Sequence, residues 1–240
     1  MNTIKTNESG RSMIEMLGVL AIIGVLSVGG IAGYSKAMNK FKTNKVADNV
    51  SMIVANVKTL YAQQKTYDGL DNEAAVSMGI IPDELVVKTA AGAYSKLLNS
   101  FNGQVFISQS NSTNSTDGKA FILEFGSLSK EACITLATND WGSGYSSGLI
   151  AMEVKNTSAA NDATAGISTL GTVMIGENSK AKLSTGTAIA MPGATGTDTT
   201  GSGSSAVTTS QIPVPMPVVT AAQACACNAG NTCSISWKYY

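Results

Sequence analysis

Four cysteines are the residues of this sequence whose chemistry is easiest to name: Cys133, Cys225, Cys227 and Cys233. An even number of cysteines in an oxidising compartment predicts two disulfides, and four cysteines allow three connectivities. A zinc site is the alternative, but the Cys-x-Cys spacing differs from the usual Cys-x₂-Cys and the chain has no His. We therefore predict disulfides, with no metal and no cofactor.

A single acid at the edge of an apolar run is the second candidate for a functional group. The run Met16–Ser35 has no charged side chain, and Glu15 directly precedes it. Twenty helical residues span about 30 Å, the thickness of the hydrocarbon core of a bilayer. A carboxylate at that depth is costly and marks a functional site, whereas at the depth of the headgroups it only marks the helix start. The residues alone leave both interpretations open.

Groups that most enzymes use are missing. The chain of 240 residues has no His, which excludes imidazole-based triads and HExxH metal sites, and it has no P-loop, GxGxxG or GxSxG motif. Its 16 basic and 16 acidic residues give zero net charge, whereas a nucleic-acid-binding protein needs a basic face. We predict that the protein is not an enzyme and that no nucleic acid is its primary ligand.

The residues around Glu15 follow a known pattern. The segment Gly10–Glu15 (GRSMIE), followed by the apolar run, resembles the class III signal of type IV pilins and pseudopilins. The resemblance implies that a prepilin peptidase removes residues 1–10 as a leader by cutting between Gly10 and Arg11, and that the new N-terminus is methylated. It also implies that Glu15 contacts the N-terminal amine of a neighbouring subunit. Arg11 stands where the family usually has an apolar residue.

The same resemblance implies where the chain resides and with what it assembles. The subunit is expected in the inner membrane first, where an assembly platform would build it into a homopolymeric helical filament. That filament is expected at the cell surface as a pilus, a kind of structure that can serve cell adhesion.

Periodicity predicts one long helix over Ser12–Gln64. No Pro or Gly occurs between Lys36 and Lys65, and apolar residues recur every three or four positions from Val46 to Tyr61. Residues 11–35 form the transmembrane and assembly half. Residues 36–65 form an amphipathic half whose apolar stripe needs a sheet to cover it, and polar residues such as Asn49 and Asn56 fall outside this stripe.

The remaining residues, 66–240, are predicted to form an α+β head. Ser184–Ser210 is expected to be a flexible surface loop, because 22 of its 27 residues are Ser, Thr, Gly or Ala. Asp71 is expected to cap a helix that ends near Met78, and Ser127 or Ser129 to cap one that ends at Thr138. Strands are expected at Val105–Gln109, Phe121–Phe125, Leu149–Lys155, Leu170–Ile175, Ala188–Met191 and Ser234–Tyr239.

Three short segments of the head resemble the type IVb branch of pilins: Gly79–Pro82, Leu98–Val105 and Ala132–Ile134. The resemblance implies the pilin α-β roll, in which the long helix packs on an antiparallel sheet. It also implies a disulfide that ties the C-terminal region to the sheet and its helix. The favoured pairings join Cys133 to Cys225 or to Cys227, and Cys233 to the remaining cysteine.

We therefore predict a structural subunit, a major pilin, that polymerises into a type IV pilus through its N-terminal helix after cleavage by the peptidase. A minor pilin or a type II secretion pseudopilin is the alternative within the same class. The alternative from another class is a membrane-anchored secreted binding protein, whose leader would be cut near Gly33 instead.

Overall fold

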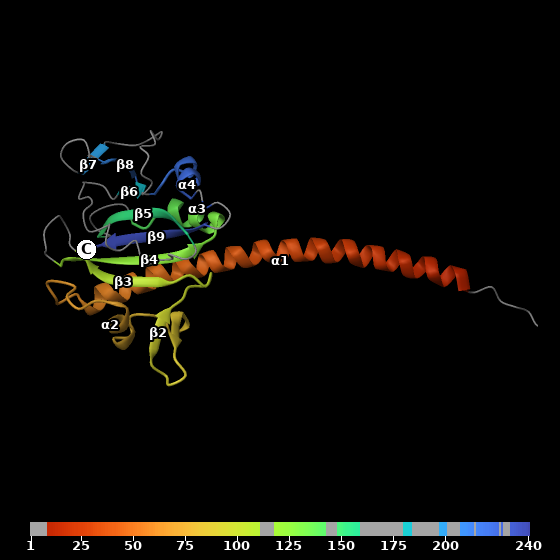
Figure 1. Cartoon of the computed structure of the whole chain (residues 1–240), viewed down its shortest axis with the longest axis horizontal. Coiled ribbons are helices and arrows are strands. Elements are labelled where there is room, and N and C mark those ends of the chain that lie inside the picture. The colour runs from red at the N-terminus through yellow and green to blue at the C-terminus, as the bar shows by residue number, and fades with distance from the viewer. Residues whose placement is uncertain are drawn as a thin grey trace, which may run out of the picture. The chain divides into compact units, whose positions relative to one another are not determined.

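The computed structural model describes residues 9–110, 118–142, 148–158, 180–183, 197–200, 207–213, 215–225, 227 and 231–240. It consists of two compact units, Met1–Phe41 and Lys42–Tyr240, and the helix α1 (Ser9–Leu60) contributes to both (Figure 1). The helix predicted over Ser12–Gln64 is confirmed, with its end four residues earlier.

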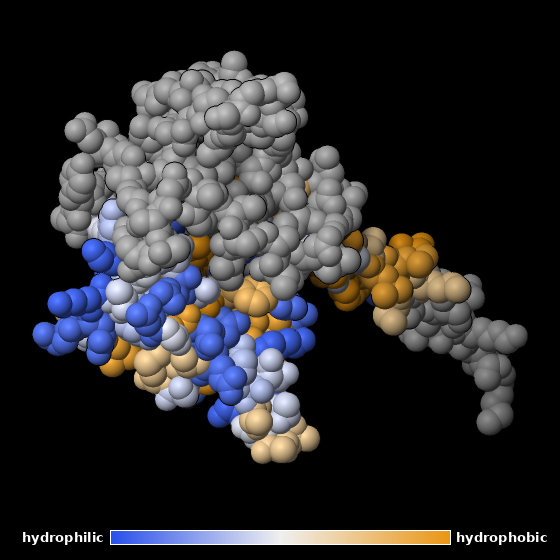
Figure 2. Space-filling view, turned by 60° about the vertical axis from the view of Figure 1, so that its left-hand side comes forward, coloured by the Kyte–Doolittle hydropathy of each residue, from blue (hydrophilic) through white to orange (hydrophobic). Residues whose placement is uncertain are grey.

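In the first unit, α1 is apolar on all sides and exposed. Every described side chain from Met13 to Ser35 is exposed, including large ones such as Ile14 at 75% and Val25 at 75%. The apolar part of this surface appears as orange atoms in Figure 2. By length and composition the helix could cross a membrane. A helix that is hydrophobic all round needs lipid or other helices around it.

In the second unit, α1 has the predicted apolar stripe. Val46, Val50, Ile53 and Val57 are all fully buried, at spacings of four, three and four residues. Burying side chains of this size contributes about 2 kcal/mol each. Leu60 is 52% exposed, whereas Tyr61, the last residue of the predicted stripe, is partly buried and packs against the core.

The stripe shares one core with a mixed sheet. Within the described residues the sheet has seven strands in the order β3-β4-β9-β5-β6-β8-β7, antiparallel except for the parallel pair β5–β6. Its strands are β3 (Val105–Ser110), β4 (Ala120–Leu128), β5 (Leu149–Ser158), β6 (Lys180–Leu183), β7 (Thr197–Thr200), β8 (Val207–Pro213) and β9 (Asn231–Tyr239).

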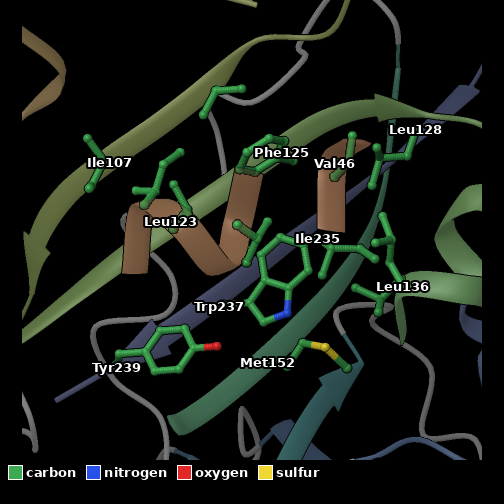
Figure 3. Close-up of a cluster of buried hydrophobic side chains, with 14 of the residues drawn as sticks. Val46, Ile107, Leu123, Phe125, Leu128, Leu136, Met152, Ile235, Trp237 and Tyr239 are labelled. Carbon is green, nitrogen blue, oxygen red and sulfur yellow. The ribbon is translucent and has the colours of Figure 1, made fainter. Parts of the chain in front are cut away.

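Register places large apolar side chains of neighbouring strands opposite one another. On β4 and β9, Phe121 faces Tyr239, Leu123 faces Trp237 and Phe125 faces Ile235. On β5, Met152 lies opposite Trp237. Apart from Phe121, these side chains are labelled in Figure 3 together with Val46 from α1. The α+β class and the long helix on a largely antiparallel sheet agree with the sequence prediction.

Short helices surround this core. In α2 (Asn72–Ser77) the carboxylate of Asp71 accepts a hydrogen bond from the Ala74 N–H at 2.8 Å, which confirms the predicted cap. In α3 (Lys130–Thr138) the cap is Ser129, whose hydroxyl accepts from the Ala132 N–H at 3.3 Å. The 3₁₀ helix η1 (Asp83–Leu85) leads into a separate hairpin of β1 (Val86–Lys88) and β2 (Tyr94–Leu97).

One loop at the start of β3 is organised by a single amide. The Asn99 carbonyl oxygen accepts from the N–H groups of Phe101 and Gly103, and its amide donates to the Gly126 carbonyl at 2.8 Å. A Cβ on Gly103 would overlap that same Gly126 carbonyl. Glycine is therefore required here because two backbone segments pass too closely for any side chain.

Other segments differ from the prediction. The stretch 184–210, expected to be a loop, contains β7 and the first part of β8. Its threonines are β-branched and favour strands, which the count of small polar residues concealed. Helix α4 (Val218–Ala224) was not predicted. The strands predicted at Leu170–Ile175 and Ala188–Met191 lie outside the described residues.

Candidate assembly helix and cysteine cluster

The predicted processing and assembly residues lie at the beginning of α1. The helix begins at Ser9, so Gly10 and Arg11 are in its first turn, and Glu15 follows Arg11 by four residues. Residues four apart lie on the same face of a helix. The Glu15 side chain is exposed in this unit. Cleavage at Gly10 and pairing of Glu15 remain predictions.

The cysteines form two disulfides within the second unit. Cys133 of α3 is bonded to Cys225, which caps the C-terminus of α4, and Cys227 is bonded to Cys233 of β9. This is one of the two pairings that the sequence left open. The sulfur atoms of Cys133, Cys225 and Cys233 lie within 4.8 Å of one another and are buried. The cluster therefore joins α3, α4 and β9 at one point.

Further contacts fasten the C-terminal region around this cluster. The Met216 N–H donates to the Ala137 carbonyl at 3.2 Å, so the chain entering α4 is held at the end of α3. The indole N–H of Trp141 donates to the Leu136 carbonyl at 2.7 Å, and its ring meets Trp237 edge to face at 5.0 Å. Trp141 thus packs on the sheet.

A row of aromatic rings extends from the end of α1 to the last strand. Tyr61, Tyr67, Phe121 and Tyr239 follow one another with centroid separations of 5.2, 4.9 and 5.7 Å. The Lys58 ammonium lies 4.9 Å from the Tyr239 ring centroid. Burial raises the pKa of Tyr239 and of Tyr67, and burial lowers the pKa of Lys58.

These shifts predict a loss of stability in alkali. A phenol whose folded pKa is raised keeps its full contribution below pH 10, where both states are protonated, and loses it as the unfolded state ionises. Lys58 acts in the opposite direction, since its penalty disappears as pH approaches 10.5. We expect Tyr239→Phe to raise the midpoint pH of alkaline unfolding by roughly half a unit. The measurement is circular dichroism of the detergent-solubilised chain between pH 8 and pH 12.

The matched control for this prediction is Tyr240→Phe, because Tyr240 is 45% exposed. The control should unfold at the wild-type pH. An equal shift in both variants would show that the effect of Tyr239 does not come from its burial.

Comparison with known proteins identifies the family. The sequence model of the family described as PilS N terminal matches residues 40–185, more than half of the chain. The chain belongs to the PilS family of type IV pilins. Type IV pilins are structural subunits rather than enzymes, so the predicted family and the prediction of no enzymatic activity are both confirmed.

Two curated relatives and one solved structure are similar to this pilin. It is 30% identical over 138 residues to the major structural subunit of bundle-forming pilus of Escherichia coli O127:H6, covering 58% of the pilin and 68% of the relative. It is 28% identical over 138 residues to the toxin coregulated pilin of Vibrio cholerae serotype O1, covering 56% and 59%. The crystal structure of a type IV b pilin from Salmonella typhi matches with a TM-score of 0.39 and 13% identity, over 80% of the pilin and 98% of that chain.

Proposed function

We propose that this pilin is the major subunit of a type IV pilus and polymerises through the first half of α1. The observation that carries the proposal is the exposed apolar surface of Met13–Ser35, attached to a head that has its own core. Such a surface is stable only in lipid or against other apolar helices. A subunit that moves from membrane to filament meets both environments in turn.

Maturation is part of the proposal. A prepilin peptidase would cut between Gly10 and Arg11 while the helix is in the inner membrane, and an assembly platform would then extract the subunit into a surface filament. The new amine of Arg11 would pair with Glu15 of a neighbouring copy. A carboxylate in an apolar environment is strongly penalised without a partner, so the pair would also set the register between subunits.

The experiment that tests the proposal is mass analysis of the N-terminus in filaments sheared from cells. We expect a mature chain beginning at Arg11, and electron microscopy with antibodies against the head should label the filaments along their length. An N-terminus near Gly33 would indicate the secreted binding protein instead. Label confined to filament tips or to the membrane would indicate a minor pilin or a pseudopilin.

A further inference from the structure

A small pocket lies inside the second unit, beside the second half of α1. Its volume is about 110 Å³. Helix α1 forms one wall, and the segments around η1 and between β2 and β3 form the other. The lining residues are Lys45, Asn49, Glu84, Leu85, Leu98, Asn99 and Ser100.

Asn49 is the unusual residue of this pocket. Its side chain is only 3% exposed, and its Nδ2 amide has no hydrogen-bond partner within the described residues. The comparison with Asn56, two helix turns later, is direct, because that amide donates to the Ile80 carbonyl at 2.9 Å. The amide of Asn99, on the opposite wall, also donates a hydrogen bond, to the Gly126 carbonyl. Buried donors are almost always paired, so Asn49 indicates an acceptor that comes from elsewhere.

The other polar groups of the pocket define that acceptor. Lys45 and Glu84 form an ion pair at the pocket with their side chains 39% and 42% exposed. A pair so accessible to water is held weakly and can be exchanged for another carboxylate. The Ser100 hydroxyl makes only a long contact of 3.4 Å to the Lys42 carbonyl. The pocket already holds one carboxylate, that of Glu84, on its cation. A second carboxylate that displaces Glu84 would meet an amide donor, a cation and a hydroxyl.

The size of the pocket limits what can enter. Pockets for cofactors and drug-sized ligands measure about 300–1,000 Å³, several times this volume. The end of one acidic side chain fits, and so do a few water molecules, each of which occupies about 30 Å³. The pocket is therefore suited to a single side chain presented by another surface.

We propose that this pocket receives an Asp or Glu carboxylate from a second copy of the chain in the filament. Asn49 donates to the entering oxygen, and Lys45 exchanges Glu84 for the new carboxylate. The chain itself carries exposed acids of the required kind, such as Glu73, Asp83 and Glu131. Met52, one turn after Asn49 on α1, is 50% exposed and is available for apolar contact with a second copy. This inference rests on the proposed polymerisation.

The test uses Asn49→Leu, which keeps the branched shape and the number of heavy atoms of the side chain and removes the donor. The full chain is produced in its own cells, and the yield of sheared filaments is compared with the amount of subunit in the membrane. We expect roughly a tenfold loss of filaments. We also expect the unfolding midpoint of the detergent-solubilised subunit to be unchanged or higher, because an unpaired buried donor has been removed.

The control is Asn56→Leu, which breaks a bond within the subunit and should lower the midpoint. A wild-type filament yield in Asn49→Leu would overturn the proposal. A lower midpoint in Asn49→Leu, as in the control, would overturn it too, since Asn49 would then act inside its own subunit or through trapped water.

A second measurement identifies the occupant. The photoreactive residue benzoylphenylalanine replaces Met52, which is 50% exposed one helical turn after Asn49 and leaves the pocket open, and sheared filaments are irradiated. We expect a dimer of this chain, with mass spectrometry placing the adduct beside an Asp or Glu of the second copy. Filaments that contain this chain but show no such adduct would overturn the pocket proposal and leave the proposed function intact. An adduct to another protein would have the same meaning. Wild-type filaments that lack the chain would overturn both.

Discussion

Removing the disulfide between Cys133 and Cys225 is expected to destabilise the head strongly. The two cysteines are 92 residues apart, so in the chain-entropy model their bond contributes about 4.5 kcal/mol to the free energy of unfolding. For a unit of this size that corresponds to a fall in the unfolding midpoint of roughly 10–15 °C. The variant to make is the double substitution Cys133→Ala with Cys225→Ala. Both cysteines are replaced because a single remaining thiol would lie close to the sulfur of Cys233 and could exchange with its disulfide.

The measurement is thermal unfolding of the detergent-solubilised chain by near-ultraviolet circular dichroism. The control is Cys227→Ala with Cys233→Ala, which opens a loop whose ends are only six residues apart. The same model gives about 2.4 kcal/mol for that loop, so the control should lose about half as much. Equal losses in the two variants would show that chain entropy is not the main contribution of the longer bond.

The parts of the fold that follow from local signals were predicted well. The stripe from Val46 to Val57 has helical spacing, and Asp71 precedes its helix with the side chain that a cap requires. The strands β3, β4, β5 and β9 were found because each contains a run of β-branched, aromatic or alternating residues. In these segments the local preference and the tertiary environment agree.

Other elements depend on contacts that a sequence does not display. Helix α4 begins after Pro217 without a side-chain cap, and it is held by the disulfide at its C-terminal cap, Cys225. Strands β6, β7 and β8 are short and pair mainly with one another and with β5. Strand β6 alternates lysine with apolar residues over only four positions, and β7 and β8 are rich in threonine within a stretch of small polar residues. Such local preferences are too weak to predict a strand without the pairing.

In the candidate sites, too, some features follow from local sequence signals and others depend on tertiary contacts. The number of cysteines predicted two disulfides, but spacing alone could not choose between Cys225 and Cys227 as the partner of Cys133. The choice depends on where α4 ends and β9 begins. Asn49 lies outside the apolar stripe and was expected on the polar side of the helix. It is buried because the loop between β2 and β3 covers it, which helical periodicity cannot reveal.

Replacing Glu15 with leucine is expected to abolish filaments while leaving the subunit in the membrane. Leucine makes the helix more apolar, so insertion should be unchanged or more favourable. Loss of the carboxylate leaves the amine of an incoming Arg11 without a partner in an apolar environment, which is strongly unfavourable. We expect sheared filaments to decrease at least about tenfold, with a wild-type amount of chain in the membrane fraction.

Two control variants separate charge from helix packing. Met16→Leu changes the neighbouring apolar residue, which is 64% exposed in the first unit, and should assemble normally. Glu15→Asp keeps the charge on a shorter side chain and should retain part of the filament yield, whereas Glu15→Gln should behave like the leucine variant. A normal yield from Glu15→Leu would mean that register is set elsewhere along α1. The acid would then mark only the depth at which the helix enters the membrane, the second of the two interpretations that the sequence allows.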